Sequence, residues 1–350
     1  MKQKIIIFGG SFDPIHNAHL YIAKHAIKKI KAQKLFFVPT YNGIFKNNFH
    51  ASNKDRIAML KLAIKSVNNA LVSNFDIKTK NAFSINTVNH FKSCYPTSEI
   101  YFLIGSDKLN ELEKWDHIQQ LKDLCTFVCY ERKPYPFNKK IANQFNVKYL
   151  AKCPLEIASS KLLNQPRKKL IPLAVLNYIN TNHLYLIPTL KAMVDDKRFQ
   201  HCLRVGKLAK QLAIANKLDA KRAFVAGAYH DLAKQLPVDQ LVNIATSELK
   251  ITNYPSWKVL HSYVGAYILK NWFGVKDKMI INAIKNHTIP PKQVSKLDMI
   301  VYLADKLEPN RKQEQWSGGI EIDQLVKLAK SNLKRAYLIT LKYVQNLVKD

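Results

Sequence analysis

The pattern of hydrophobic residues changes between the two halves of the chain. Up to about residue 155, short runs of β-branched and aromatic residues alternate with helical segments, whereas beyond residue 199 only helical patterns follow. Strands separated by helices predict a parallel sheet with crossover helices, and the later helices predict an all-α domain. The 350 residues suffice for two cores. We therefore expect an α/β domain over residues 1–187 and an all-α domain over residues 188–350, with the boundary near Pro188.

The same patterns predict individual elements. We expect strands over residues 4–8, 35–38, 71–75, 100–104 and 126–130, and helices over residues 18–30, 84–91 and 107–112. Ser52 and Asp55 form a capping-box pattern that starts another helix, which continues to about residue 66. In the second half we expect helices over residues 199–216, 220–232, 238–246, 259–272, 277–287, 294–306 and 322–348.

The composition is that of a globular but strongly basic protein. The formal net charge is +30, which suits anionic phosphate substrates or nucleic acid. The lysines are dispersed and the chain is rich in Lys, Asn and Ile, so a general compositional bias explains the charge better than an RNA site. No apolar run has the roughly 20 residues that span a bilayer, and the N-terminus lacks a signal-peptide pattern. The five cysteines have no metal-site spacing, which favours buried free thiols and a cytoplasmic location.

A glycine-rich loop with two histidines follows the first expected strand, in the string Gly9-Gly-Ser-Phe-Asp-Pro-Ile-His-Asn-Ala-His19. Glycines at the end of a parallel strand let backbone amides approach a phosphate, and the next helix directs its positive pole there. His16 and His19 are three residues apart and share one face at helical spacing. The arrangement indicates phosphoryl-transfer chemistry, with an ordinary Gly-Gly turn as the structural alternative.

This string resembles the GGxFDPxHxGH signature of the HxGH nucleotidyltransferases, and residues 3–187 resemble their nicotinate-nucleotide adenylyltransferase branch. Further residues that carry the likeness are Pro39-Thr40, Lys46, Arg56, Phe83–Thr87, Gly105–Asp107, Trp115 and Glu131–Pro134. The resemblance implies a Rossmann-like domain that transfers AMP from ATP to nicotinate mononucleotide, giving deamido-NAD and pyrophosphate. Magnesium would enter with ATP.

The resemblance also implies roles for single residues. His16 and His19 would bind the ATP phosphates and stabilise charge in the transition state, and Lys46 would meet a phosphate. Asp107 would hold ribose or pyridine groups, or serve only as a helix cap, and Trp115 would stack on the pyridine ring or pack at a helix edge. The other expected substrate-binding residues are Gly9, Gly10, Ser11, Phe12, Asp13, Thr87, Gly105, Arg132, Ser159 and Ser160.

Two positions depart from the family pattern. Ala18 replaces the glycine between the histidines, a small change that still permits close approach. The family's ISSTxxR phosphate-binding motif appears as Ile157-Ala-Ser-Ser-Lys-Leu-Leu163, so leucine stands where arginine is expected. Ser159 and Ser160 can still cap a helix and donate to phosphate, and Lys161 or Arg167 could supply the missing charge.

Six residues of metal-ligand type recur in the helical half: His201, His230, Asp231, His261, His287 and Asp305. Imidazoles and carboxylates suit iron, manganese or magnesium. Asp231 and Asp305 each follow an apolar run, where an unpaired buried charge would cost several kcal/mol. Metal coordination would remove that cost. The alternative is an unrelated set of surface and core residues.

The order of these ligands resembles that of the HD phosphohydrolase superfamily. Strings such as RFQHCLRV, AGAYHDLAK and MIVYLADKLEPNR resemble its branch that hydrolyses diadenosine tetraphosphate symmetrically, over residues 192–347. The resemblance implies a dinuclear centre that activates water, with His201, His230, Asp231 and Asp305 on one ion and His261 and His287 reaching the second. Asp231 and Arg204 would act in catalysis, Arg204 by neutralising substrate phosphate. Lys234 and Arg311 are further candidates, and each of these cations could equally be a surface charge.

Three functional hypotheses stand at this point. In the first, which we expect, both halves are enzymes that act on small nucleotides. In the second, the adenylyltransferase works and the HD half is regulatory. In the third, the basic chain binds RNA and both folds serve as platforms. The sequence predicts neither the oligomeric state nor the choice between the nicotinate and nicotinamide mononucleotides.

Overall fold

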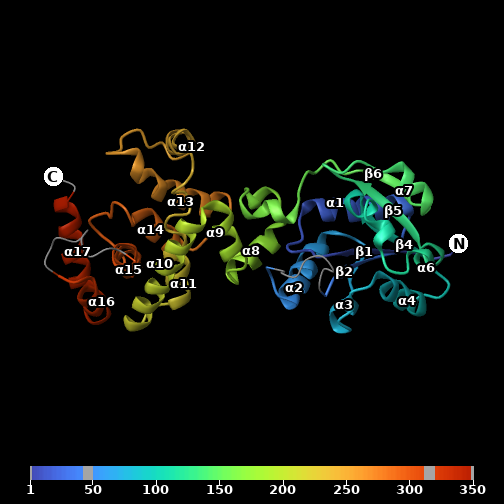
Figure 1. The fold of residues 1–350 in the computed structure, drawn as a ribbon, viewed down its shortest axis with the longest axis horizontal. Coiled ribbons are helices and arrows are strands. Elements are labelled where there is room, and N and C mark those ends of the chain that lie inside the picture. The colour runs from blue at the N-terminus through green and yellow to red at the C-terminus, as the bar shows by residue number, and fades with distance from the viewer. Residues whose placement is uncertain (1, 42–49, 311–319, 348–350) are drawn as a thin grey trace. The chain divides into compact units, whose positions relative to one another are not determined.

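The computed structural model describes residues 2–41, 50–310 and 320–347, and these form two compact units (Figure 1). The first unit comprises Met1–Leu162 and Arg167–Leu184, and the second comprises Leu163–Pro166 and Tyr185–Asp350. An α/β unit followed by an all-helical unit confirms the predicted fold class. In the parts of the chain that the structure describes, no helix combines the length and apolar character needed to cross a membrane.

The first unit is built on a six-stranded parallel sheet with strand order β3-β2-β1-β4-β5-β6. The strands are β1 (Lys4–Gly10), β2 (Lys34–Pro39), β3 (Ala70–Val72), β4 (Glu99–Gly105), β5 (Thr126–Glu131) and β6 (Lys148–Lys152). Ile5, Ile6 and Ile7 of β1 are fully buried, as expected for a parallel strand covered on both faces. The strand order reverses direction between β1 and β4, and such a point opens a ligand crevice at the carboxyl ends of the strands.

Helices connect these strands. They are α1 (Asn17–Ile30), α2 (Asn53–Ala63), α3 (Phe75–Lys78), α4 (Ser84–Cys94), α5 (Ser106–Leu109), α6 (Ile118–Leu124), α7 (Lys139–Gln144) and α8 (Leu173–Thr181). Short 3-10 turns lie at Ile64–Ser66, Leu112–Lys114, Ser159–Leu163 and Arg167–Lys169. The predicted start of α2 is confirmed, because the Ser52 Oγ accepts the Asp55 amide at 3.1 Å.

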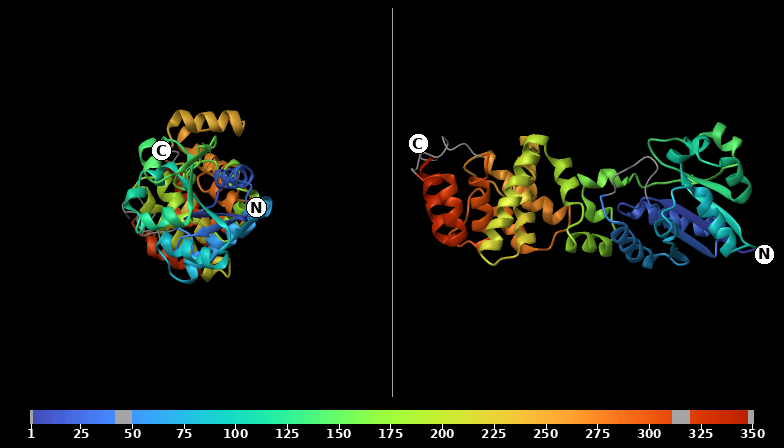
Figure 2. Two further views of the ribbon diagram at one scale, coloured as in Figure 1. Left: turned by 90° about the vertical axis from the view of Figure 1, so that its right-hand side faces the viewer. Right: turned by 60° about the horizontal axis from the view of Figure 1, so that its bottom comes forward.

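The second unit is entirely helical in its described residues, and the bundle is seen from another side in Figure 2. Its α-helices are α9 (Leu186–Met193), α10 (Asp196–Ala215), α11 (Ala220–Tyr229), α12 (Val238–Asn243), α13 (Leu260–Asn271), α14 (Lys278–Asn286), α15 (Lys296–Lys306), α16 (Ile322–Ser331) and α17 (Leu333–Leu347). A π-helical turn at Ile244–Glu248 extends α12, and a 3-10 turn at Trp257–Val259 precedes α13.

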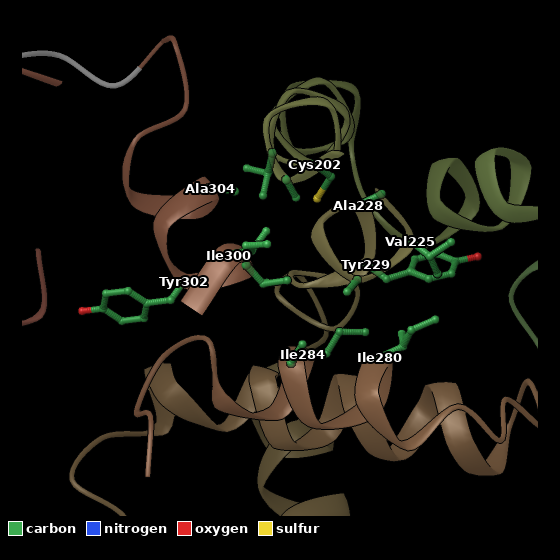
Figure 3. Packing of buried hydrophobic residues seen from close by; sticks show 14 of the residues in the cluster. Cys202, Val225, Ala228, Tyr229, Ile280, Ile284, Ile300, Tyr302 and Ala304 are labelled. Carbon is green, nitrogen blue, oxygen red and sulfur yellow. The ribbon is translucent and has the colours of Figure 1, made fainter. Parts of the chain in front are cut away.

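One continuous core joins these helices. Figure 3 shows Ile280 and Ile284 of α14 directed toward Tyr229 of α11, with Cys202 of α10 above them. Two glycines bring α10 and α11 together: a Cβ added at Gly227 would lie 2.9 Å from the Ala209 Cβ and 3.1 Å from the Gly206 Cα. The close approach matters because both helices carry predicted metal ligands.

Several elements differ between the prediction and the structure. Strand β6 has no counterpart in the prediction, because it is an edge strand in which only Leu150 is buried between charged ends. The strand expected over residues 71–75 stops at Val72, and Phe75 begins α3. The helix expected over residues 322–348 is two helices, since Asn332 is extended (φ −143°, ψ 81°) and its Oδ1 accepts the Arg335 amide at 3.1 Å.

Candidate active sites

The loop after β1 places the two predicted histidines together. His16 is the N-cap of α1 in an extended conformation (φ −143°, ψ 172°), so it lies just outside the helix that contains His19. Its backbone amide donates to the His19 Nδ1 at 3.2 Å, and the two rings stack with centroids 3.7 Å apart. The capping geometry of His16, and not only helical spacing, therefore brings the imidazoles together.

Both imidazoles are neutral near pH 7. Burial and the nearby Arg132 charge lower the pKa of His16 to about 3. Burial, His16 and Arg132 also hold the pKa of His19 well below its ordinary value. The His16 Nδ1 is buried and has no hydrogen-bond partner among the described residues. A buried polar atom without a partner is costly, and a polar ligand at this position would remove the cost.

A charged pair closes the same edge of the sheet. Arg132, which follows β5, contacts Asp107, which follows β4: its Nε lies 2.8 Å from Oδ1 and its second terminal nitrogen donates to Oδ2 at 2.9 Å. Gly105 makes room for the pair, because a Cβ there would lie 2.5 Å from the Asp107 Oδ1. The structure thus gathers these three predicted residues beside the histidines, with a cation that suits a phosphate.

Other predicted residues of the loop shape it. The Asp13 carboxylate accepts the backbone amides of His50 at 2.7 Å and Ala51 at 3.2 Å. Phe12 is buried with a positive φ of 45°. Arg56, which is fully buried, donates at 2.7 Å to the carbonyls of Ser11 and Thr40 and to the Asn53 Oδ1. These side chains fix the backbone of the loop that follows Gly9 and Gly10, which are the last two residues of β1 and not part of the loop as predicted.

Thr87 lies in a buried polar network at the start of α4. Its Oγ1 donates to the Asp76 Oδ1 at 2.7 Å, and the Asn81 side-chain amide donates to the same oxygen at 3.0 Å. Burial raises the pKa of Asp76, although hydrogen bonds from Asn81 and Thr87 oppose the shift. The sequence analysis missed Asp76 and Asn81. Through Asp76, Thr87 anchors the start of α4, and its contact with substrate stays a prediction.

The other predicted residues of this unit either pack or form hydrogen bonds within it, or lie outside the described residues. Trp115 packs edge-on against Phe102 and Phe127, with ring centroids 5.8 and 6.1 Å away, and its stacking on the pyridine ring stays a prediction. Ser159 donates to the Pro14 carbonyl at 3.1 Å, which joins the segment Ile157–Leu163 to the loop after β1 that carries His16. Arg167 is buried and donates from Nε to the Leu162 carbonyl at 2.7 Å. Lys46 and the side chains of Ser160 and Lys161 lie outside the described residues.

In the helical unit, the six predicted metal ligands converge on one place. They come from α10 (His201), the end of α11 (His230 and Asp231), α13 (His261), the end of α14 (His287) and α15 (Asp305). The Asp231 Oδ2 lies 3.9 Å from the His201 Nε2 and 3.4 Å from the His230 Nε2. The Asp305 Oδ1 lies 3.4 and 3.5 Å from these same nitrogens.

Asp231 reaches a second group with its other oxygen. Its Oδ1 lies 3.0 Å from the His261 Nε2 and 3.6 Å from the His287 Nε2, and those two nitrogens are 3.2 Å apart. One carboxylate therefore faces two sets of imidazoles, one with each oxygen. This is the placement expected of a ligand that bridges two ions.

The outward-facing nitrogens fix the orientation of each ring. The Nδ1 atoms of His230, His261 and His287 lie 2.7, 2.7 and 2.6 Å from the backbone carbonyls of Gly227, Lys258 and Ile284. Each Nδ1–H therefore donates to a carbonyl, which turns the Nε2 atom inward, as in metal-binding histidines.

The charges of the cluster also suit cations. Burial alone would raise the pKa of Asp231, but His230 and the other imidazoles hold it well below its ordinary value. Burial would lower the pKa of His230, but Asp231 and Asp305 raise it to about 10. Ionised carboxylates and inward-facing imidazole Nε2 atoms form a donor set that fits one or two divalent metal ions once His230 has lost its proton, and two triads within it are close enough to hold an ion.

A cavity of about 230 Å³ opens beside these ligands. Besides four of the ligands it is lined by Arg198, Lys234, Thr288 and Lys306. Arg198 and Lys306 were not predicted from the sequence, although Lys306 directly follows Asp305 and Arg198 lies three residues before His201. Arg204 is absent from this lining and binds Glu308 instead, with its Nε donating to Oε2 at 2.7 Å. Arg311 lies outside the described residues.

The fold and these two sites define a nucleotidyltransferase-type α/β unit joined to a helical unit with a metal-binding cluster. The chain belongs to the cytidylyltransferase-like family, whose sequence model matches residues 7–204, and it contains an HD domain, matched over residues 198–310.

Known proteins resemble the whole chain as well as its parts. The probable nicotinate-nucleotide adenylyltransferase/Ap4A hydrolase of Mycoplasma pneumoniae is 58% identical over 345 residues, which cover 99% of this chain and 100% of the relative. The probable nicotinate-nucleotide adenylyltransferase of Aliarcobacter butzleri is 39% identical over 49% of this chain and 91% of its own length. A crystal structure of a predicted HD superfamily hydrolase involved in NAD metabolism, from Clostridium acetobutylicum, is 31% identical with a TM-score of 0.43, over 47% of this chain and 86% of that chain.

Proposed function

We propose that the chain carries two enzymatic activities. Residues 1–187 transfer AMP from ATP to nicotinate mononucleotide, and residues 188–350 hydrolyse dinucleoside polyphosphates such as diadenosine tetraphosphate. The observation that carries the second activity is the convergence of six ligands around Asp231. The likeness to the Mycoplasma pneumoniae protein along the full chain supports both activities in one polypeptide.

In the transferase, a phosphate oxygen of the mononucleotide forms a bond to the α-phosphorus of ATP, and the bond from that phosphorus to the bridging oxygen breaks to release pyrophosphate. The attacking phosphate is already anionic, so no general base is required. His16 and His19, held neutral by burial and by Arg132, donate hydrogen bonds to the triphosphate without a proton transfer. The N-terminus of α1 and Arg132 add positive potential at the same edge. Magnesium would accompany ATP.

In the hydrolase, a divalent pair, when bound, would polarise the phosphate oxygens and activate water. Iron or manganese suits the imidazole-rich set better than magnesium. The protein's own residues do the rest: Asp231 spans both halves of the centre, while Arg198, Lys234 and Lys306 bring positive charge to the cavity for the polyphosphate. Cleavage between the second and third phosphates of diadenosine tetraphosphate would give two molecules of ADP.

The test is product analysis with the purified full-length protein. ATP with nicotinate mononucleotide should give deamido-NAD and pyrophosphate, and ATP with nicotinamide mononucleotide should give less dinucleotide. Diadenosine tetraphosphate should yield ADP only after iron or manganese is supplied, and chelation should stop this reaction. Intact diadenosine tetraphosphate in the presence of each metal would refute the hydrolase assignment.

We also propose a cytoplasmic location. The free state of all five cysteines, four of them buried, supports a reducing compartment. Fractionation of the source cells tests it, and recovery of the protein with the secreted fraction would contradict it.

A further inference from the structure

Glu308 is a buried carboxylate that has no part in the proposed hydrolase. It lies two residues beyond α15 and is 4% exposed. Its Oε1 is 3.3 Å from the His201 Nδ1, and its Oε2 accepts the Asn310 amide at 3.1 Å. The Arg204 guanidinium holds it from the other side, with Nε donating to Oε2 at 2.7 Å and a terminal nitrogen donating to Oε1 at 3.4 Å. Arg204 and the Asn310 amide thus hold the Glu308 carboxylate against the side of the His201 ring that faces away from the metal site.

His201 differs from the other three histidines in this respect. They donate from Nδ1 to neutral backbone carbonyls, whereas His201 faces a carboxylate. Glu308 forms an ion pair with the Arg204 guanidinium, whose Nε lies 2.7 Å from Oε2, so the group that faces His201 is a carboxylate. An anionic acceptor makes the imidazole more electron-rich and fixes its tautomer, and both effects strengthen the bond from Nε2 to a metal.

The two halves of the metal centre are therefore unequal. The first half consists of His201, His230, Asp305 and the Oδ2 of Asp231. The second half consists of His261, His287 and the Oδ1 of Asp231. The second half has one ligand fewer, and among these six ligands its only carboxylate is Asp231, which it shares with the first half.

Resting on the proposed metal-dependent hydrolase, we propose that Glu308 is a positioning residue that makes the first half the tighter metal position. Arg204 acts one step further out by holding Glu308 against His201. Metal ions consequently bind in two steps, the first at the half that Glu308 supports. This role accounts for the placement of Arg204 outside the substrate cavity.

The experiment is a Mn²⁺ titration of the full-length protein after chelation, with free Mn²⁺ measured by electron paramagnetic resonance. The wild-type chain should bind two ions in two separable steps. Glu308→Gln should weaken the tighter step by roughly 10- to 100-fold and leave the weaker step unchanged. Glu248→Gln is the matched control. It removes an exposed carboxylate of the same unit, and this carboxylate accepts a hydrogen bond from the Tyr267 hydroxyl at 2.8 Å. It should leave both steps as in the wild type.

The unfolding temperature of each metal-free variant separates positioning from simple structural support. If Glu308→Gln lowers that temperature and both Mn²⁺ affinities stay at wild-type values, the proposal is overturned. Should Glu308→Gln fail to fold, Arg204→Gln takes its place and must weaken the same tighter step, or the proposal falls. A wild-type chain that binds no Mn²⁺ would instead refute the metal-dependent hydrolase itself.

Discussion

Replacing Gly227 by alanine adds one methyl group between α10 and α11. The new carbon would lie 2.9 Å from the Ala209 Cβ, 3.1 Å from the Gly206 Cα and 3.1 Å from the Val205 carbonyl oxygen. Carbon atoms in ordinary contact are about 3.5–4.0 Å apart, so the helices must move apart by a large fraction of an ångström. All three crowding atoms belong to the backbone or are a Cβ, so none of them can rotate away.

The cost follows from comparison with a second glycine. Overpacking of this kind costs about 1–3 kcal/mol, while alanine in a helix gains about 1 kcal/mol over glycine. Gly265→Ala in α13 has the same gain without the crowding, because its new carbon would lie 3.7 Å from the Ile284 Cγ2 and 3.8 Å from the Ala233 Cβ. The difference between the two variants therefore isolates the overpacking, about 1–3 kcal/mol, or roughly 2–12 °C in the unfolding temperature of the helical unit.

The assay is thermal unfolding of both metal-free variants, followed by Mn²⁺ titration. The Nε2 atoms of His201 in α10 and His230 at the end of α11 lie 3.3 Å apart, and Gly227 allows these two helices to approach, so Gly227→Ala should also weaken metal binding. Gly265→Ala should match the wild type in affinity and equal or exceed it in stability. Equal stability of the two alanine variants would refute the close approach of α10 and α11 from which the metal centre is derived.

Three further changes test other parts of the account. Asp231→Asn should abolish both Mn²⁺ binding steps and hydrolysis while adenylyl transfer persists, which separate assays on one preparation will show; loss of transfer would contradict the separation of the two sites. The pKa of His16 in the folded protein (about 3) lies below its ordinary value of 6.5, so the unfolded chain binds more protons between these pH values. The free energy of unfolding should therefore fall, by up to about 1.4 kcal/mol per pH unit, as the pH drops from 6.5 toward 3. In His16→Asn, the free energy of unfolding measured with urea should depend less steeply on pH. Arg56→Met should cost about 1–3 kcal/mol in urea unfolding and weaken ATP binding, because three half-buried acceptors lose their donor. Lys54→Met, an exposed change in the same helix, should alter neither.

Local chemistry made much of this architecture predictable from sequence. The Ser52 cap and the apolar runs of β1, β2, β4 and β5 each depend on a few adjacent residues, and all appear where expected. Strand β6 is different, because pairing with β5 stabilises it and its own sequence buries only Leu150. The break at Asn332 likewise depends on one side chain that caps the next helix, a signal that the long apolar pattern conceals.

The metal ligands could be predicted because histidine and aspartate are chemically distinctive. The residues that orient these ligands could not be predicted. Sequence cannot show that each oxygen of Asp231 faces a different pair of imidazoles, since that depends on the packing of four helices. Arg204 was expected at substrate phosphate, and only the fold reveals Glu308 between it and His201. One usable signal existed: Glu308 follows the buried face of α15, where an acid needs a partner.

The pKa values of His16 and His230 shift in opposite directions, because the charges around the two rings differ. At the histidine loop, burial and Arg132 lower the pKa of His16 to about 3, so the ring meets a polyanion as a neutral donor that never competes for a proton. In the helical unit, Asp231 and Asp305 overcome burial and raise the pKa of His230 to about 10, so without metal the ring holds a proton that a cation must displace. Metal binding to this centre should therefore release protons and strengthen as the pH rises. Triphosphate binding at the first site should show no such dependence on its histidines, because they are already neutral.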